Sequence, residues 1–289
     1  MDTWIILSPI LKAFFYAASF GSVGSFLFCL HFAKHLTTEQ QAYCGSLGYR
    51  CTLAGAVMSL LMVLSVAGNL GGDIVSVINP LLLQLALESR PGVGYLTAFI
   101  GFIGMLVAHR LRGYANKLGL LVSSGVILLS FTMSGHSQLG GFLTQSLLFI
   151  HLFGIAFWLG ALLPFRWMCL QSDPHNLSIV AHHFGVFAVG YVGLLISVGL
   201  CYAYLLLGNI SLMFTTLYGN VLLIKIALVV ALLSFGAFNK FKLVPTLEIK
   251  RAHAVGQFRR SVQFEIAIAI IIFTTSSLLT TSMTLPMGN

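Results

Sequence analysis

Uninterrupted apolar segments recur along the whole chain, and they are longer than the strands or buried helices of a water-soluble domain. A helix rises 1.5 Å per residue, so about twenty apolar residues cross the roughly 30 Å of hydrocarbon in a bilayer. The expected spans are residues 4–34, 44–68, 92–110, 115–134, 144–169, 182–207, 217–241 and 261–284. The sequence therefore predicts an all-α polytopic membrane protein, in which residues 1–289 form a single membrane domain with a bundle of eight transmembrane helices.

The composition excludes a water-soluble globule. Hydrophobic residues make up 58% of the chain and charged residues only 8%, which is too little polar surface to cover a soluble domain. The first apolar segment begins at Trp4, directly after Met1 and Asp2. It lacks the basic region and the small-residue cleavage site of a removable signal peptide. We therefore expect it to be retained as the first span.

Basic residues follow a side-specific pattern that predicts the orientation in the membrane. Alternate connections between the spans hold Lys34, Arg50, Arg110, Arg112, Lys117, Arg166, Lys240, Lys242, Lys250, Arg251, Arg259 and Arg260. The other connections hold Arg90, beside Asp73 and Glu88. Cytoplasmic connections carry the excess of Lys and Arg in membrane proteins. The pattern predicts both termini in the periplasm, and it explains the net charge of +8 by the lipid bilayer rather than by a nucleic-acid partner.

One outer connection, residues 69–92, is longer than the others and contains an apolar stretch of about a dozen residues. Such a stretch is too short to span the bilayer. We expect it to form an interfacial or re-entrant segment.

Metal-capable side chains are distributed unequally between the two sides. By this topology, His136 and His151 are the two histidines toward the outside, and Met133 precedes His136 by three residues. A thioether suits Cu(I), and imidazole suits copper in either oxidation state. His151 is expected roughly 10 Å below the outer surface. An ionisable group at that depth is energetically costly unless it has a partner, and it commonly has a functional role. Met133, His136 and His151 are therefore the candidate metal site.

Other polar residues inside the expected spans are candidates for a pathway or a gate. Trp158 follows His151 by seven residues and shares its helix face. Lys225 is expected at the depth of His151, where it acts as a charge gate or extends to the outer headgroups. Asn239 and Glu265 are expected at one level nearer the cytoplasm, where they can relay cations or protons. Lys225 and Glu265 differ in level by well over ~10 Å, so no ion pair between them is expected.

A second group of soft ligands lies toward the cytoplasmic side. Its members are Cys29, His31, His35 and Cys44, which form a candidate site for inner metal release. Their helical phases do not converge, which favours ordinary packing over a shared metal.

Short motifs in the second half of the chain resemble one known family. They are SGHS (134–137), HLFGIAFWLGALLP (151–164), LYGNVLLIK (217–225), NKFKLVP (239–245) and RRSVQFE (259–265). In order and spacing they are similar to the copper resistance protein D (CopD) family of bacterial inner-membrane proteins, across a signature region of about residues 130–284. The first 130 residues resemble the family mainly in hydropathy.

This resemblance implies an eight-helix protein that moves copper ions from a periplasmic CopC-like copper-binding protein toward the cytoplasm. The matching positions are His136, His151, Trp158, Lys225, Asn239 and Glu265. The chain also departs from the family pattern. An Arg-x-x-His pair common in the first span is replaced by Lys12 and Phe15, and a Trp-x-Gly-Gly motif ends in Ala161. The outer site is then left with two histidines and either a methionine or a backbone oxygen.

Three functions remain open from the sequence. The leading hypothesis is a copper permease or delivery protein that contributes to copper homeostasis or resistance and is not an enzyme. The first alternative is a b-type membrane cytochrome, with haem between histidines on facing helices. The second is a scaffold that holds a periplasmic copper chaperone without transport. No nucleotide-binding loop is present, so ATP hydrolysis by this chain is not expected.

Overall fold

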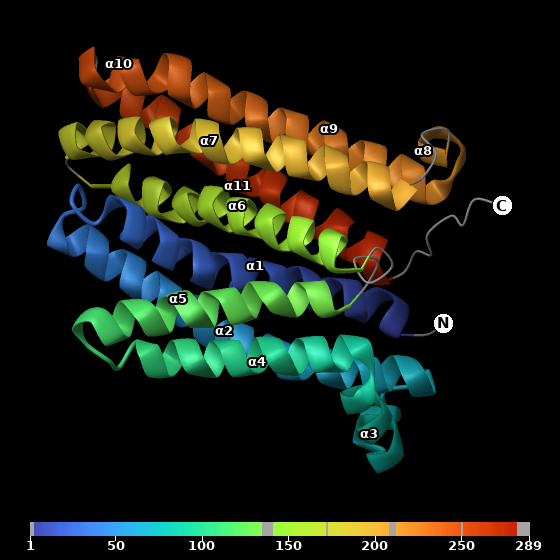
Figure 1. Ribbon diagram of the computed structural model, residues 1–289. Helices are drawn as coiled ribbons and strands as arrows, with labels where there is room; N and C mark the ends of the chain where they lie inside the picture. The colour runs from blue at the N-terminus through green and yellow to red at the C-terminus, as the bar shows by residue number, and fades with distance from the viewer. Residues whose placement is uncertain (1–2, 135–140, 172, 208–211, 250, 282–289) are drawn as a thin grey trace.

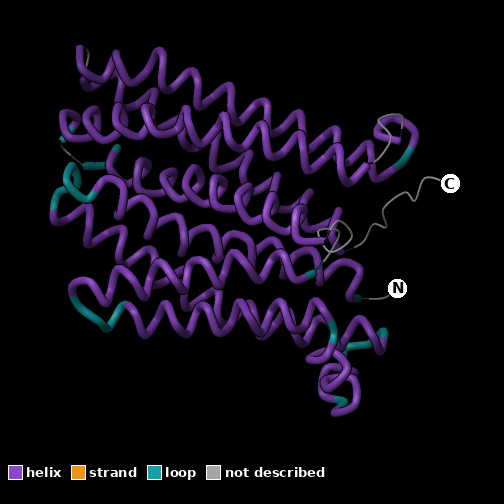
Figure 2. Tube along the Cα trace, in the orientation of Figure 1, coloured by secondary structure: helices purple, strands orange, loops and turns teal. Residues whose placement is uncertain are grey.

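The protein is a bundle of long helices joined by short loops (Figures 1 and 2). A computed structural model describes residues 3–134, 141–171, 173–207, 212–249 and 251–281. The α-helices are α1 (Trp4–Phe32), α2 (Thr38–Gly71), α3 (Pro80–Glu88), α4 (Arg90–Ala108), α5 (Gly113–Ser130), α6 (Gly141–Met168), α7 (Pro174–Leu207), α8 (Leu212–Thr215), α9 (Leu217–Phe238), α10 (Val244–Ile249) and α11 (Arg251–Thr281). Two 3₁₀ turns, Val75–Ile78 and Phe131–Met133, and one π-helical turn, Asn239–Leu243, complete the regular structure of these ranges. The predicted all-α fold is confirmed.

The described residues contain eight helical segments long and apolar enough to cross a membrane, as the sequence predicted. Three of them begin well before the predicted apolar runs, by more than one helical turn. The runs expected from 44, 182 and 261 lie in helices that begin at Thr38, Pro174 and Arg251. Polar residues continue each of these helices beyond the hydrocarbon. Hydropathy marks the part of a helix in lipid, whereas its end depends on caps such as the Thr37 hydroxyl, which accepts from the Gln40 N–H at 3.3 Å.

The two ends of the bundle differ in charge. Trp4 at the start of α1 and Thr281 at the end of α11 lie at one end, on the right of Figure 1, which we call the terminal end. The loops after α1, α4 and α6 lie at the opposite end, with Lys34, Arg110 and Arg112 in or beside them. We call this the basic end. The separation of charge predicted from the sequence is therefore present in the fold.

Helix α1 is the central element of the bundle. It packs against α2, α6 and α11. Of its most apolar 18 residues 67% are buried inside the bundle, whereas the corresponding figure for the segment Gly219–Leu247 is 6%. Its backbone comes very close to that of α6 at one point. A Cβ atom added to Gly160 would lie 2.2 Å from the Cα of Gly24. Two glycines thus let the backbones of α1 and α6 touch, as small residues do between membrane helices.

Helices α1 and α2 pack antiparallel along their full lengths, and their contacts keep one register. Ser8 and Ser65 hydrogen-bond through their hydroxyls at 2.8 Å. Nearer the basic end, a Cβ on Gly21 would lie 2.7 Å from the Sγ of Cys51. One turn further, a Cβ on Gly48 would lie 3.4 Å from the Cβ of Ser25. The two residue numbers add to about 73 at each contact, so the seam is straight and continuous.

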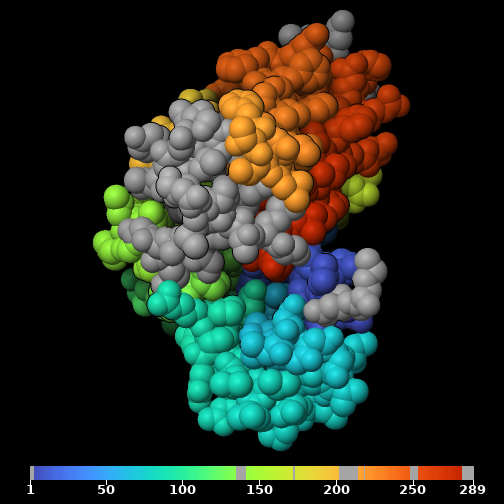
Figure 3. Space-filling model, turned by 90° about the vertical axis from the view of Figure 1, so that its right-hand side faces the viewer, coloured from blue at the N-terminus to red at the C-terminus, as the bar shows by residue number. Residues whose placement is uncertain are grey.

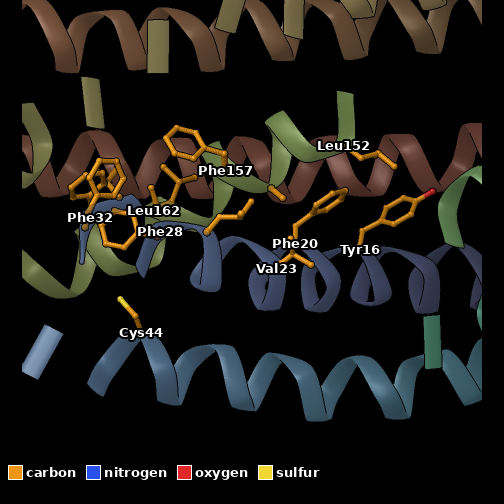
Figure 4. Packing of buried hydrophobic residues seen from close by; sticks show 14 of the residues in the cluster. Tyr16, Phe20, Val23, Phe28, Phe32, Cys44, Leu152, Phe157 and Leu162 are labelled. Atoms are coloured by element: carbon orange, nitrogen blue, oxygen red, sulfur yellow. The ribbon is translucent and has the colours of Figure 1, made fainter. Parts of the chain in front are cut away.

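Aromatic side chains fill the centre of the bundle. Figure 4 shows Phe20, Phe28 and Phe32 on α1 directed toward Leu152, Phe157 and Leu162 on α6. Phe28 and Phe32 are fully buried, with 0% of their surface exposed. The outward faces carry exposed apolar side chains instead, among them Ile100, Leu200 and Ile270. In a bilayer these side chains lie against lipid.

The connection between α2 and α4 forms a short lobe at the terminal end. It contains the 3₁₀ turn Val75–Ile78 and α3, and Figure 3 shows this region projecting beyond the rest of the bundle. Asn79 caps α3 by accepting from the Leu81 N–H at 3.0 Å. Val75, Ile78 and Leu81 expose most of their surface. The predicted short, non-spanning segment is present as a separate helix of nine residues.

We predict that Gly160→Ala destabilises the protein because the new methyl group would collide with the backbone of α1. Overpacking of this kind typically costs about 1–3 kcal/mol of unfolding free energy. Thermal unfolding in detergent micelles measures the change. Gly125→Ala on α5 is the matched control, because no atom lies within 4 Å of a Cβ at that position. Equal melting temperatures for the two variants would contradict the close contact of α1 and α6.

Candidate functional site

A buried carboxylate joins three helical segments in the half of the bundle nearer the basic end. Glu265 on α11 exposes 3% of its surface. Its Oε2 accepts a hydrogen bond from the Trp158 indole N–H on α6 at 3.2 Å, and its Oε1 accepts one from the Asn239 side-chain amide. Buried charges persist in proteins when they are hydrogen-bonded in this way. We call these three residues the Glu265 cluster.

A local break in helical geometry precedes this cluster. Asn239 opens the π-helical turn that follows α9, and the Val244 N–H donates to the Asn239 carbonyl five residues earlier. Pro245 has no N–H, and its ring would clash with the carbonyl of Phe241 in an α-helix. The widened turn accommodates this proline, and Asn239 is buried within it. Such π turns occur frequently at functional sites.

A cavity of about 200 Å³ lies beside the cluster. Trp158, Asn239 and Glu265 contribute to its wall, together with apolar side chains such as Phe184 and Phe258. The Oδ1 atom of Asn239 is buried and has no hydrogen-bond partner in the described part of the chain. Each water occupies about 30 Å³. The cavity is therefore large enough for several waters or a partly hydrated ion beside the Glu265 cluster.

Glycine allows Trp158 to occupy its position. A Cβ atom on Gly236 of α9 would lie 2.3 Å from Cζ2 of the Trp158 indole. Phe184 of α7 meets the same ring edge-on, with centroids 6.2 Å apart. The indole is thus held between α7 and α9 with its N–H directed to Glu265. It forms part of the cavity wall, as its candidate role in a pathway requires.

His151 lies on α6, nearer the terminal end. A Cβ on Gly199 of α7 would be 3.3 Å from the imidazole Cε1, and the backbone of Leu195 also lies next to the ring. Its Nδ1 is sealed from solvent and has no hydrogen-bond partner within the described ranges. The Lys225 ammonium on α9 is close enough to interact electrostatically with the ring. The expected proximity of Lys225 and His151 is therefore present.

His151 and Trp158 share one face of α6, as the sequence spacing predicted. His151 meets α7 near Gly199, and Trp158 meets α7 near Phe184. Both lie toward α9 as well, through Lys225 and Gly236 respectively. One helix face therefore presents an imidazole in the half nearer the terminal end and leads to the Glu265 carboxylate. This face therefore presents two candidate cation-binding groups at successive depths.

The remaining members of the predicted outer site fall elsewhere or outside the described residues. Met133 closes the 3₁₀ turn after α5, and its Cβ lies 3.7 Å from the position of a Cβ on Gly94 of α4. The contacts recorded for Met133 are thus with α4, whereas those of His151 are with α7 and α9. His136 lies outside the described residues. A joint site of Met133, His136 and His151 stays a prediction.

The histidines of the predicted inner release group are engaged with neighbouring residues. His31 Nδ1 lies 2.9 Å from the Leu27 carbonyl oxygen, and its Nε2 lies 3.1 Å from the Tyr191 hydroxyl. His35 stacks on His183 with ring centroids 3.9 Å apart. These contacts separate the two imidazoles and use both nitrogens of His31.

The two cysteines of that group do meet. Cys29 on α1 and Cys44 on α2 lie close enough for their thiol groups to interact. This pair is an exception to the expected lack of convergence among the four residues. Spacing within a single helix does not show which residues of two helices meet, because that depends on the register between α1 and α2.

Within the described ranges, no group of three or more His, Cys, Asp or Glu side chains is close enough to hold a metal ion. The sequence reasoning placed Asn239 and Glu265 at one level, which their hydrogen bond confirms. It missed the bond from Trp158 to Glu265. The sequence indicates this bond only in that Trp158 and Glu265 both lie in motifs of the same family, at 151–164 and 259–265.

Comparisons with known proteins identify the family of this chain. The family model described as "Copper resistance protein D-like, N-terminal domain" matches residues 1–145, and the model "Copper resistance protein D" matches residues 179–279. The chain belongs to the copper resistance protein D family. Inner membrane protein YebZ of Escherichia coli (strain K12) is 30% identical over 240 residues, which cover 78% of this chain and 80% of that protein. No solved structure matches the chain.

Family membership gives this protein a copper-related function and a place in the inner membrane as a multi-pass protein. The family match extends over the first half of the chain, where the sequence analysis found mainly a likeness in hydropathy. The Glu265 cluster joins α6 to α9 and α11, and both Asn239 and Glu265 lie within residues 179–279 of the second match. The cluster therefore belongs to the copper resistance protein D portion of the fold.

We predict that Trp158→Phe lowers the free energy of unfolding by about 1–3 kcal/mol, because Glu265 loses one of its two donors. The same change in a Glu265→Leu background should cost much less, since no carboxylate is left unpaired. Chemical unfolding in micelles of the four members of this double-mutant cycle measures the coupling. Trp167→Phe, which alters a ring stacked on Tyr43, serves as a control that should not couple to Glu265. Additive effects for Trp158 and Glu265 would contradict the hydrogen bond.

Proposed function

We propose that this protein carries copper ions across the inner membrane from the periplasm toward the cytoplasm, and that it is not an enzyme. The observation that carries the proposal is the shared face of α6. That face presents His151 in one half of the bundle and, through Trp158, leads to the buried Glu265 in the other. Family membership supplies the identity of the ion as copper.

Entry of the ion takes place at the terminal end. His136 and Met133 capture copper at the mouth, and His151 receives it below the surface. Thioether and imidazole groups suit copper and bind hard cations such as Mg²⁺ or Ca²⁺ poorly. The unpartnered Nδ1 of His151 is free to act as a ligand, because no described protein group occupies it.

Lys225 controls passage beyond His151. A charged ammonium near the imidazole repels an arriving cation, so copper moves past it only with an accompanying anion or after Lys225 loses a proton. This side chain therefore acts as a charge gate. Ionisable groups at such depth in a membrane protein commonly mark ion pathways.

The Glu265 cluster forms the inner half of the route. Its carboxylate offers negative charge to a cation that arrives along α6, and Asn239 lines the same cavity. Carboxylate groups inside membrane proteins commonly relay cations or protons. The ion leaves the cavity toward the basic end.

Orientation follows from the charge of the loops. The basic end faces the cytoplasm and the terminal end, with both chain termini, faces the periplasm. The periplasmic donor is a CopC-like copper-binding protein that docks at the terminal end, where the mouth of the route lies.

Haem binding receives no support from the histidine geometry. The rings of His35 and His183 stack in direct contact, which leaves no space for a macrocycle between them. Both nitrogens of His31 have partners in Leu27 and Tyr191. We therefore favour copper transport over a b-type cytochrome.

The double variant His136→Ala with His151→Ala tests the proposed entry site in cells. We expect copper accumulation to fall to the level of cells that lack the protein, because both outer imidazoles are removed. Elemental analysis of washed cells and growth on graded copper measure the effect. His175→Ala with His253→Ala is the matched control, since both side chains are exposed and belong to the basic end. Unchanged accumulation and copper sensitivity in the first variant would overturn the proposal.

A further inference from the structure

The seam between α1 and α2 brings two thiols together near the basic end. Contacts along the seam pair Ser8 with Ser65 and, further along, Ser25 with Gly48. One more turn in the same register pairs Cys29 with Cys44. Their thiol groups are then close enough to interact with each other. The pair is thus produced by the packing of two long helices and not by a flexible loop.

The surroundings of this pair leave one thiol sealed and the other reachable. Cys44 exposes 2% of its surface and belongs to the central core, and Figure 4 shows its side chain directed from α2 toward α1 near Phe28 and Phe32. Cys29 is partly exposed. An incoming ion therefore has access from the Cys29 side, while apolar side chains shield the other.

The donor set selects for one class of ion. Zinc in structural sites takes four ligands, and no third His, Cys, Asp or Glu in the described parts of the chain is close enough to complete a metal group with this pair. Thiolates are soft ligands and prefer Cu(I) among common cellular cations. The nearby His31 already has partners for both of its nitrogens. Two thiols without further ligands therefore suit a low-coordinate soft cation.

We propose that Cys29 and Cys44 form a two-thiolate binding site for a soft monovalent cation, Cu(I), near the basic end of the bundle. Binding replaces two S–H bonds by two Cu–S bonds and releases two protons, so the copper does not change oxidation state and the site gains one negative charge overall. The choice of ion rests on the proposed copper transport. The site itself lies on the α1–α2 seam, apart from the face of α6 that carries His151.

Positive charges are available near this site. Arg50 and Arg166 both interact electrostatically with the Tyr43 hydroxyl, and Cys44 acts on the same group. A bound cuprous dithiolate carries a single negative charge, which attracts positive charge in its surroundings. The reducing conditions of the cytoplasm keep both thiols free to bind a metal.

Anaerobic titration of the purified, reduced protein with Cu(I) tests the proposal, with bathocuproine disulfonate as the competing chelator. Wild-type protein should bind one equivalent more than Cys29→Ser or Cys44→Ser. Cys51→Ser, on the same seam, and Cys201→Ser are the controls, and both should keep the wild-type stoichiometry. X-ray absorption at the copper edge should show sulfur neighbours that are lost in the first two variants.

A measurement on unaltered protein guards against misfolding of the variants. Cu(I) should protect the partly exposed Cys29, and not Cys201, from alkylation by N-ethylmaleimide, as mapped by mass spectrometry of peptides. Equal alkylation with and without Cu(I), or a Cys29–Cys44 disulfide in protein prepared under reducing conditions, would overturn the site. These experiments are done at equilibrium. Failure here with intact dependence of cellular copper on His136 and His151 would reject the thiol site alone, and the reverse result would reject the transport route alone.

Discussion

The buried carboxylate of Glu265 is the interaction on which the arrangement of the second half of the bundle depends. An ion without partners in a membrane interior costs several kcal/mol. Here α6 supplies one donor through Trp158 and the turn after α9 supplies another through Asn239. Each donor has its own structural requirement, namely Gly236 beside the indole and the π turn before Pro245. The polar cluster therefore fixes how α6, α9 and α11 sit together, and it leaves a cavity beside them.

The first half of the chain acts as the frame for this cluster. Helix α1 lies at the centre, in backbone contact with α6 at Gly24 and Gly160, and in register with α2 along its length. Its position holds the opposite face of α6 in place, so that His151 and Trp158 are directed toward α7 and α9. In this way the first half of the chain determines how the candidate site residues of the second half are oriented.

Much of this architecture follows from the sequence, for identifiable physical reasons. Apolar runs specify the number and order of spans, because only a helix satisfies its backbone in lipid. Helical spacing placed His151 and Trp158 on one face. Contacts between helices are different, because they depend on register and rotation that hydropathy does not encode. The bond from Trp158 to Glu265, the meeting of Cys29 with Cys44 and the π turn at Asn239 therefore emerged only from the packed structure.

The central claim is that the face of α6 forms a copper route, and uptake of isotope-labelled copper by proteoliposomes tests it most directly. The account predicts that liposomes with purified wild-type protein accumulate copper faster than protein-free liposomes, and that His151→Ala abolishes the difference while His253→Ala keeps it. A protein that only holds a periplasmic chaperone would move no copper. Uptake by wild-type proteoliposomes equal to that of protein-free liposomes would contradict the account.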